Sequence, residues 1–480
     1  MSSEPNWEEV NQDKEKKKLA VLEHIKSRCT SSSDIDDLRT INSYLSNGSE
    51  INIEILTGGL ANYSYAVSCE DVKIFAKLSF PFAQLFPDKP CPLSRTDNEY
   101  VMMKKFNALN PSLVSTPYFC DDIGDDMKLL VTQYSPVDEQ FGNQFIDGSV
   151  DKRTADKIAE GLSRLHQKET ETDELQFNSE MKPWVQSLTP ILEKIINNLH
   201  NPDNSNRVAV LAKQLGEDKT NDALGGYVST LDESECLIHA DCHPFNLLVG
   251  KKPSIESLQE YEESGSVVFV DFEMSRGGIP ATDIGPLRAF PISCAFAHAL
   301  NGHRSAADNC LDWVTSFWSA YEAKIRDFGL TSEEVKKIYI QAMQYSALYL
   351  LAGYGIGVHM EYLPVDQDNT KDLERVKESI GIIGLKFLMY GMDTDSELSL
   401  EKLKAKFLQA IEEEVSQLIG VKKVRRNRRS SMLRMSGRRV SDGNIRAGIL
   451  DRKSTNSTNS AKLLGMIESV SAADEVIAMQ

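Results

Sequence analysis

The stretch His239-Ala-Asp-Cys-His-Pro-Phe-Asn-Leu-Leu-Val249 decides the fold of this chain, together with the later run Val267-Val-Phe-Val-Asp-Phe-Glu273. Pro244 blocks the continuation of a helix, so Asp241 and Asn246 are expected on a tight loop. The apolar residues at the end of the first stretch then predict a short strand. The first stretch therefore indicates a loop that carries polar side chains into the edge of a small sheet.

The second run is apolar until it reaches Asp271, and it predicts a strand with that residue at its end. Residues 250–266 are rich in Lys, Glu, Ser and Gly and favour a hairpin connection. Asp241, Asn246 and Asp271 would then face a common point. Phosphoryl transfer from Mg-ATP needs a carboxylate to take the hydroxyl proton, and an Asn and an Asp to hold magnesium. The pattern therefore predicts Asp241 as the base and Asn246 and Asp271 as ligands of Mg2+.

The order H-x-D-x-x-x-x-N, then a hydrophobic strand and V-D, is the counterpart of the kinase catalytic loop and its metal-binding Asp. On residues 239–246 the sequence resembles the aminoglycoside phosphotransferase and choline kinase branch of the protein-kinase-like superfamily. The resemblance implies an α+β, two-lobed fold with a small antiparallel-sheet N-lobe and a mainly helical C-lobe. It also implies ATP as cofactor, a small-molecule hydroxyl substrate, and a structural role for Asp283.

Two simpler interpretations compete for the catalytic loop. His239, Asp241, Cys242 and His243 could form a zinc site, but such a site needs four well-spaced ligands and no second cluster follows. An Asp in a loop is often only a turn or cap residue. The joint appearance of Asp241, Asn246 and Asp271 in the right order favours the phosphotransfer interpretation.

The N-terminal half supplies candidates for nucleotide binding. Residues 51–67 predict two strands joined by a turn with Gly58 and Gly59, whose backbone amides can approach an anion closely. A Gly-Gly turn alone is often only a hairpin. With Asn62, these glycines are the expected cover of the ATP phosphates.

The next strand and the helix after it add a charged pair. Lys77, on the strand Val72–Leu78, is where a kinase needs a cation for the α- and β-phosphates, and Glu99 is the candidate partner on the following helix. The apolar strand that ends at Gln133 and Tyr134 suits a hinge between lobes. Its backbone is expected to meet adenine.

A Pro-rich insertion moves the resemblance towards one subfamily. The segment 77–95, ending in Pro92-Leu-Ser-Arg95, looks like the insertion that methylthioribose kinases carry after their strand lysine. The stretch 271–285 is similar to the D-x-E-x-x-x-x-G-x-x-x-x-D-x-G pattern of the same family. At Asn246 the sequence departs, because another small polar residue is expected in methylthioribose kinases. The resemblance implies a kinase of a methylthioribose-like sugar.

Two other functions stay open. A choline or ethanolamine kinase would need aromatic and acidic walls, which Trp313, Trp318 and Glu273 could supply. Arg276, Arg288 and Arg304 could instead contact an anionic or polyhydroxy substrate. A non-catalytic, ATP-binding pseudokinase module is the second alternative, and the intact set of catalytic residues argues against it.

Composition narrows the remaining classes. The formal net charge of -18 over 480 residues argues against general nucleic-acid binding. The eight cysteines are scattered and suit reduced thiols. The charged segment Met1–Lys18 cannot be a signal peptide, and no apolar run is long enough to span a membrane. These features favour a cytoplasmic protein, and nothing in the sequence indicates an oligomeric state.

The domain organisation follows from these patterns. Residues 1–50 predict a helical lead-in, 51–133 the N-lobe, 134–420 the helical C-lobe, and 421–480 a basic, Ser-rich disordered tail. In this tail, Arg428-Arg-Ser-Ser431 and Arg438-Arg-Val-Ser441 resemble substrates of a basophilic protein kinase.

Overall fold

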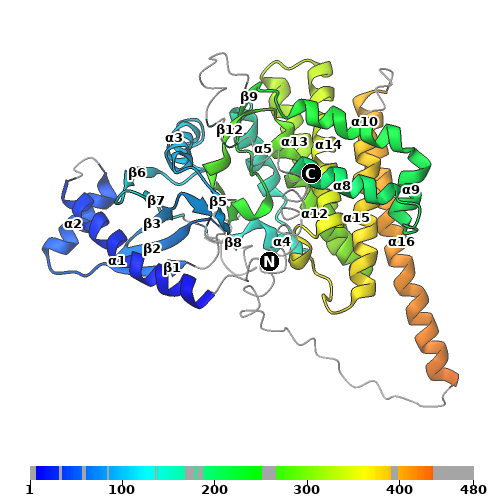
Figure 1. Ribbon diagram of the computed structural model, residues 1–480, viewed down its shortest axis with the longest axis horizontal. Helices are drawn as coiled ribbons and strands as arrows, with labels where there is room; N and C mark the ends of the chain where they lie inside the picture. Colours follow the sequence, from blue (N-terminus) through cyan, green and yellow to red (C-terminus); the bar gives the residue numbers. More distant parts are fainter. Residues whose placement is uncertain are drawn as a thin grey trace, which may run out of the picture.

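A computed structural model describes most of the chain (Figure 1). A lobe built on a sheet, coloured blue and cyan, lies beside a larger helical lobe coloured green to orange. The residues described are 7–31, 35–56, 61–83, 86–135, 137, 139–167, 178, 181, 188–250, 266–390 and 398–435. Gly58 and Gly59 and most of the expected tail lie outside these ranges.

The smaller lobe is built on an antiparallel sheet. Within the described residues the strand order is β1-β2-β3-β7-β6, with bounds Asn52–Leu56, Tyr63–Cys69, Val72–Ser79, Lys128–Gln133 and Pro117–Asp122. Lys77 of β3 pairs with Ser64 of β2 on one side and with Leu130 of β7 on the other. Its backbone is therefore held in the centre of the sheet, where a side chain is positioned most rigidly.

Two N-terminal helices cover one face of this sheet, α1 and α2 (Trp7–Ser31 and Asp36–Ser46). Ile25 of α1 is fully buried in one apolar cluster with Tyr65 of β2. The guanidinium of Arg28 donates to both carboxylate oxygens of Asp121 on β6. Apolar packing and this charge-assisted pair together fix α1 to the sheet.

The lobes meet at α3 (Ser94–Leu109), which follows the short strands β4 (Phe82–Ala83) and β5 (Phe86–Pro90). Helix α3 contacts the 3-10 turn η3 (Phe272–Met274), which belongs to the larger lobe. Glu99 and Arg95 of α3 are both buried. This helix is therefore placed to pass charged side chains into the junction.

The larger lobe packs around α12, most of whose residues are buried, since α13, α14, α15 and α16 all contact it. The helices among its described residues are α4 (Phe141–Asp147), α5 (Arg153–Leu165), α8 (Leu188–His200), α9 (Arg207–Leu215), α10 (Glu217–Thr230), α12 (Ala281–Asn301), α13 (Arg304–Asp327), α14 (Ser332–Ile356), α15 (Thr370–Tyr390) and α16 (Leu400–Met435).

Short strands carry the predicted catalytic stretches between these helices. Leu247 of β10 pairs with Phe269 of β11 in an antiparallel ladder, as a hairpin requires. Since Leu247 starts its strand and Phe269 ends the other, the residues before β10 lie beside those after β11. The bounds are β8 (Glu139–Gln140), β9 (Cys236–Ile238), β10 (Leu247–Val249), β11 (Val267–Phe269) and β12 (Arg276–Gly278).

The expected disordered tail needs a correction at its start. Helix α16 continues past residue 420 to Met435 and projects beyond the body of the lobe (Figure 1, orange). Residues 421–435 contain no Gly or Pro and are rich in Lys, Arg, Met and Leu, which are good helix formers. Charge alone therefore does not end this helix.

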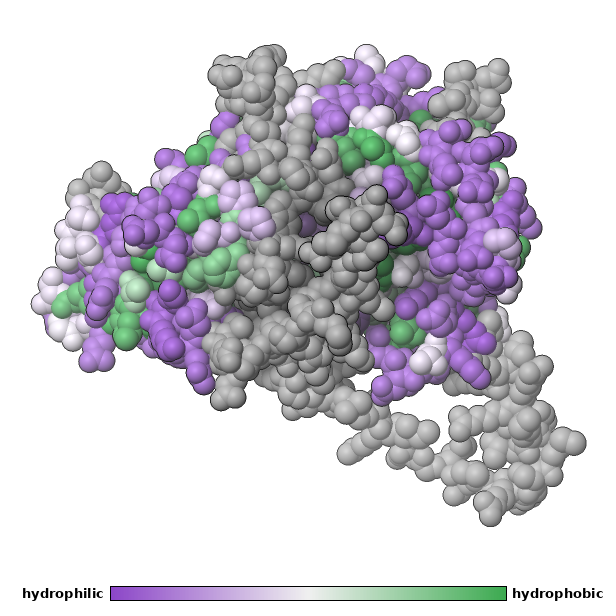
Figure 2. All heavy atoms as spheres, viewed as in Figure 1, coloured by the Kyte–Doolittle hydropathy of each residue, from purple (hydrophilic) through white to green (hydrophobic). Residues whose placement is uncertain are grey.

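The described surface is mostly polar. Hydrophilic residues cover most of the described part of the face shown in Figure 2, with small apolar patches between them. Among the described residues, no helix is both long and apolar enough to cross a membrane.

Candidate active site

The catalytic loop is suspended from one buried carboxylate. Asp283, near the start of α12, accepts the backbone N–H groups of His239 and Ala240, each at 2.8 Å. Ala240 has a left-handed φ of 64°, which is uncommon for a residue other than glycine. The two hydrogen bonds from consecutive amides explain how the loop holds this conformation.

A histidine keeps Asp283 charged. His166 Nε2 lies 2.9 Å from Asp283 Oδ2, and its Nδ1 lies 2.8 Å from the hydroxyl of Tyr321. Burial opposes ionisation of Asp283, but the hydrogen bond and charge of His166 outweigh it, and the pKa of Asp283 is lowered. His166 therefore supports the catalytic loop through Asp283.

Asp241 and Asn246 are in direct contact. Asn246 Nδ2 donates to the backbone oxygen of Asp241 at 3.0 Å and to its Oδ2 at 2.9 Å. Burial, and after it the charge of Asp271, raises the pKa of Asp241 to about 7. A carboxylate with a pKa near neutrality is well suited to act as a general base.

Lys77 lies among three carboxylates from both lobes. Its Nζ is 2.8 Å from Glu99 Oε2, 2.6 Å from Asp271 Oδ1 and 3.3 Å from Glu273 Oε2. Burial disfavours a charged lysine, but the charges of Asp271, Glu273 and Glu99 prevail and raise the pKa of Lys77 well above its ordinary value. Lys77 is therefore a permanent cation at the junction of the lobes.

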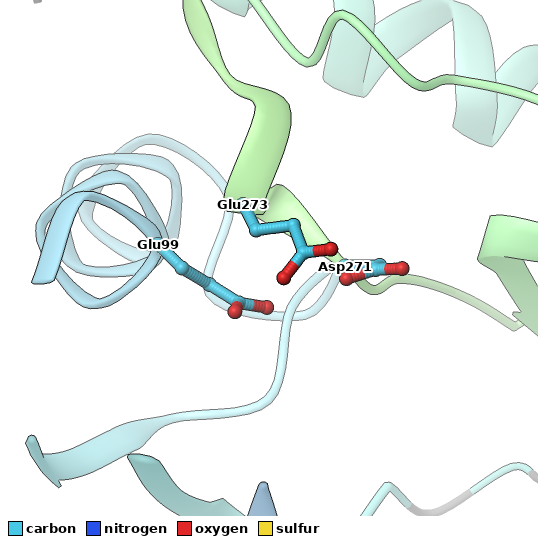
Figure 3. A group of neighbouring side chains, drawn as sticks. All are labelled: Glu99, Asp271 and Glu273. Carbon is cyan, nitrogen blue, oxygen red and sulfur yellow. The ribbon is translucent and has the colours of Figure 1, made fainter. Parts of the chain in front are cut away.

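Figure 3 shows the three carboxylates, Glu99 from α3 and Asp271 and Glu273 from the segment after β11. One oxygen of each lies within 4.8 Å of the others. Asp271 has a left-handed φ of 67°, and its side chain is 37% exposed, whereas Glu99 is 3% exposed. Carboxylate oxygens are the ligands that magnesium prefers. Since Lys77 Nζ lies among these three carboxylates, Asp271, the most accessible of them, is the member that fits a Mg2+ site.

A buried arginine joins the segment that carries Asp271 and Glu273 to the Pro-rich insertion. Arg95 is 0% exposed, and its Nη1 donates to the carbonyl oxygens of Phe80, Cys91 and Pro92. Its Nε reaches Glu273 Oε2 at 3.3 Å. The sequence pattern pointed to this arginine as a motif residue, but not to its contact with Glu273.

Asn62 completes this network. Its Nδ2 donates to Glu273 Oε2 at 2.8 Å, and its Oδ1 accepts from Arg95 Nη2 at 2.8 Å. Its side chain is thus bonded to protein groups rather than directed at open space.

Gln133 and Tyr134 were expected at the hinge between the lobes. Gln133 is the last residue of strand β7, and Tyr134 follows it. The backbone N–H of Gln133 donates to the oxygen of Thr116 at 2.8 Å, and the side chain of Gln133 is exposed. Lys73 Nζ lies 3.9 Å from the ring centroid of Tyr134.

Residues 53–313, more than half of the chain, match the family described as the phosphotransferase enzyme family. The chain belongs to this family. The predicted kinase-like fold and the predicted enzyme, a phosphotransferase, are confirmed. This phosphotransferase matches no curated protein sequence.

Solved structures similar to this phosphotransferase include a spectinomycin phosphotransferase in complex with ADP and spectinomycin. It is 12% identical, covers 74% of this chain and 100% of its own, and has a TM-score of 0.36. An aminoglycoside phosphotransferase from Alicyclobacillus acidocaldarius is 13% identical, covers 75% and 92%, and has a TM-score of 0.41. The macrolide 2'-phosphotransferase from Brachybacterium faecium is 12% identical, covers 70% and 97%, and has a TM-score of 0.33.

The prediction that Trp313, Trp318 and Glu273 could line an acceptor site in this phosphotransferase is wrong. Trp313 is fully buried and its Nε1 donates to Thr154 Oγ1 at 2.9 Å, while Trp318 is 3% exposed and its Nε1 donates to Glu322 at 3.0 Å. Both rings belong to the helical core, because residues at spacings of three and four share the buried face of α13. Glu273 is bound to Lys77 and Arg95.

The three arginines considered for the substrate are not at the catalytic loop as free cations. Arg276 is 3% exposed and bonds the oxygen of Gly277, and Arg288 is 1% exposed and lies over the rings of Tyr339 and Phe407. Arg304 pairs with Asp308 and Glu412 on the surface. We therefore assign none of them to substrate binding.

Proposed function

We propose that this phosphotransferase moves the γ-phosphoryl group of Mg-ATP to a hydroxyl group of a methylthioribose-like sugar. The proposal rests on one observation, which is that the catalytic loop and the segment after β11 lie next to each other at the junction of the lobes. The loop with Asp241 and Asn246 and the segment with Asp271 are adjacent, since the N–H of Val270 donates to the oxygen of Asn246 at 3.1 Å.

Asp241 would accept the proton of the acceptor hydroxyl as its oxygen attacks phosphorus. Its pKa near 7 leaves a carboxylate available at neutral pH that can still hold a proton. Asn246 orients the carboxylate of Asp241 by donating a hydrogen bond to it from Nδ2. The other end of the same amide, Asn246 Oδ1, is then left for a metal ion. Asn246 and Asp271 would hold Mg2+, which supplies charge neutralisation at the phosphates.

Lys77 would contact the α- and β-phosphates, and Glu99 would hold its side chain in place. In the structure Lys77 Nζ bonds Asp271, so this contact must exchange for nucleotide and metal when ATP binds. Gly58, Gly59 and Asn62 are proposed to cover the phosphates through their backbone, since the side chain of Asn62 already bonds Glu273 and Arg95. The backbone at Gln133 and Tyr134 is proposed to meet adenine.

The sugar assignment rests on the two segments that resemble methylthioribose kinases. Arg95 comes from the Pro-Leu-Ser-Arg element and Glu273 from the D-x-E element, and these side chains are in contact. Their contact gives both elements one shared physical purpose, which is to fix the carboxylate beside Asp271. Choline and ethanolamine are not favoured as acceptors, because Trp313 and Trp318 are buried in the helical core.

Magnesium-dependent ADP release with methylthioribose, other pentoses, choline, ethanolamine, homoserine and aminoglycosides tests the proposal, with Asp241→Asn as the blank. Release above the blank with methylthioribose supports it. Release with another acceptor alone contradicts the sugar assignment. Normal ATP binding without release by any acceptor would favour the pseudokinase interpretation.

A further inference from the structure

Asn178, between α5 and α8, is a buried residue that contacts the segment carrying Asp271. Its side-chain Nδ2 donates to the backbone oxygens of Glu273 and Ser275, each at 2.9 Å, and the residue is 7% exposed. Its Oδ1 accepts from Asn98 Nδ2 of α3 at 2.7 Å. Both polar atoms of this side chain are therefore bonded to groups at the junction of the lobes.

The partners of Asn178 require an amide side chain. A backbone oxygen only accepts hydrogen bonds, so the oxygens of Glu273 and Ser275 must face the donor Nδ2. The amide of Asn98 in turn donates to the acceptor Oδ1. An aspartate of the same shape has no hydrogen to donate when it is ionised, so it could not hold the two backbone oxygens.

The turn η3 cannot satisfy these two oxygens alone. It is only three residues long, and Ser275 follows it directly and is fully buried. The carbonyl groups at the end of so short a helix have no later N–H within the turn to accept from. A buried carbonyl without a partner is costly, and the amide of Asn178 supplies the partner.

The contacts of Asn178 hold the backbone on one side of Asp271. The two oxygens belong to the residues two and four positions after Asp271, so this stretch cannot shift without breaking both bonds. On the other side, the N–H of Val270 donates to the oxygen of Asn246 at 3.1 Å. The backbone of Asp271 is thus fixed from both directions.

Asn178 also connects this segment to α3 and to the catalytic loop. Asn98 immediately precedes Glu99, whose carboxylate lies beside those of the segment after β11 in Figure 3. Ser275 Oγ donates to the backbone oxygen of His239 at 3.2 Å. One side chain therefore sets the spacing between α3, the segment with Asp271 and the catalytic loop.

The backbone of Asn178 is held in an uncommon conformation. Its φ of 51° is left-handed, which asparagine tolerates better than most residues other than glycine. Its backbone oxygen accepts the N–H of Met181 at 3.1 Å, and Met181 is 1% exposed. The amide is thus directed into the junction from an anchored position.

We propose that Asn178 is a positioning residue for magnesium, which fixes the direction of the Asp271 carboxylate and thereby strengthens the binding of Mg-ATP. It acts through the backbone of Glu273 and Ser275 and contacts neither metal nor nucleotide. The inference rests on the proposed function in one respect, the role of Asp271 as a ligand of Mg2+. It does not depend on the identity of the acceptor.

The test measures how much Mg2+ tightens ATP binding. Asn178→Gly removes the amide and keeps the left-handed backbone, which glycine adopts readily. Calorimetry gives the Kd for ATP in EDTA and in excess Mg2+, and the ratio of the two values is the magnesium coupling. We expect wild type and Asn178→Gly to have equal Kd in EDTA. The coupling should be smaller in the variant by on the order of tenfold, as for other residues that orient metal ligands.

Asn206→Gly is the matched control. Asn206 Nδ2 donates to the hydroxyl of Tyr354 at 2.7 Å, and its Oδ1 accepts the N–H of Ala209 at 2.8 Å. This variant also loses an asparagine that joins two segments, but its partners lie on α9 and α14. Its magnesium coupling should equal that of wild type. An equal coupling in Asn178→Gly would overturn the inference, because Asn178 would then serve stability alone.

The remaining outcomes separate this inference from the proposed function. No acceptor is present, so failure to phosphorylate methylthioribose leaves the test intact. If Mg2+ does not tighten ATP binding in wild type, the metal role of Asp271 fails and the inference fails with it. If Asn178→Gly does not fold, Asn98→Ala decides, since alanine is a good helix former. A smaller coupling in Asn98→Ala supports the inference, and an unchanged coupling overturns it.

Discussion

Arg95 and Glu273 are in contact at the junction of the lobes, with Arg95 Nε 3.3 Å from Glu273 Oε2. The same carboxylate oxygen accepts from Asn62 at 2.8 Å and lies 3.3 Å from Lys77 Nζ. This one oxygen of Glu273 thus contacts two cationic side chains and an amide. The position of the D-x-E segment depends on a residue that is distant in sequence.

Replacing Arg95 should disturb both stability and metal binding. Arg95→Lys keeps the charge but loses the planar donors that reach Glu273, Asn62 and three backbone carbonyls. We expect a loss of about 3 kcal/mol in the free energy of unfolding, and a weaker Mg2+ dependence of ATP binding in calorimetry. Arg39→Lys, at an exposed pair with Asp36, should change the free energy of unfolding by less than about 0.5 kcal/mol. Similar effects of the two variants would contradict the network.

Asp283→Asn should release the catalytic loop. The amide of Asn cannot accept both N–H groups of His239 and Ala240, and it removes the charge beside His166. We expect a fall in kcat with little change in the Kd for ATP, and a loss of about 3 kcal/mol of stability. Asp312→Asn, on the surface, should show neither effect.

The contribution of Asp283 to the free energy of unfolding should decrease as the pH falls. The pKa of Asp283 is lowered in the folded state, so its contribution to stability is complete above the unfolded pKa of about 3.9. It declines as the pH falls through the lower, folded pKa. Melting curves of wild type and Asp283→Asn should therefore differ most at neutral pH and converge in acid. A difference that grows on acidification would contradict the assignment.

Helix α1 should be part of the core of the N-lobe rather than an appendage. Ile25 is 0% exposed and Leu19 in the same helix is 65% exposed. Ile25→Ala should cost about 2 to 4 kcal/mol in the free energy of unfolding, because it leaves a cavity against β2. Leu19→Ala should cost little, and denaturant titration of both variants measures the difference. Equal, small effects would mean that α1 is dispensable for the sheet.

The basic tail is predicted to accept phosphate. Ser431 and Ser441 each follow a pair of arginines, whereas Ser457 does not. Incubation with a basophilic protein kinase, followed by mass spectrometry, should place phosphate on Ser431 or Ser441 and not on Ser457. Modification of Ser457 alone would contradict the motif assignment.

Local sequence patterns predicted the parts of the site that are close in the chain. Asp241 and Asn246 were predicted on one loop and facing a common point, and in the structure their side chains are in contact. Lys77 and Glu99 could be paired only through the order of strand and helix known for kinases, and they are 2.8 Å apart.

Contacts between distant segments could not be predicted in the same way. Asn62 and Glu273 are separated by 211 residues, and nothing in either neighbourhood marks the other. His359 follows a long apolar helix, and its left-handed backbone is invisible in the sequence. The sequence left open whether Trp313 and Trp318 line an acceptor site, and the burial of both rings places them in the core.

The central claim is that Asp241 takes the proton during phosphoryl transfer, and single-turnover kinetics test it most directly. Preformed enzyme–Mg-ATP complex is mixed with methylthioribose, and phosphorylated product is measured for wild type and Asp241→Asn. The account predicts equal ATP affinity and a transfer rate lower by a factor on the order of 100 or more in the variant. Near-equal transfer rates would contradict it, and Asp241 would then lose the role of base.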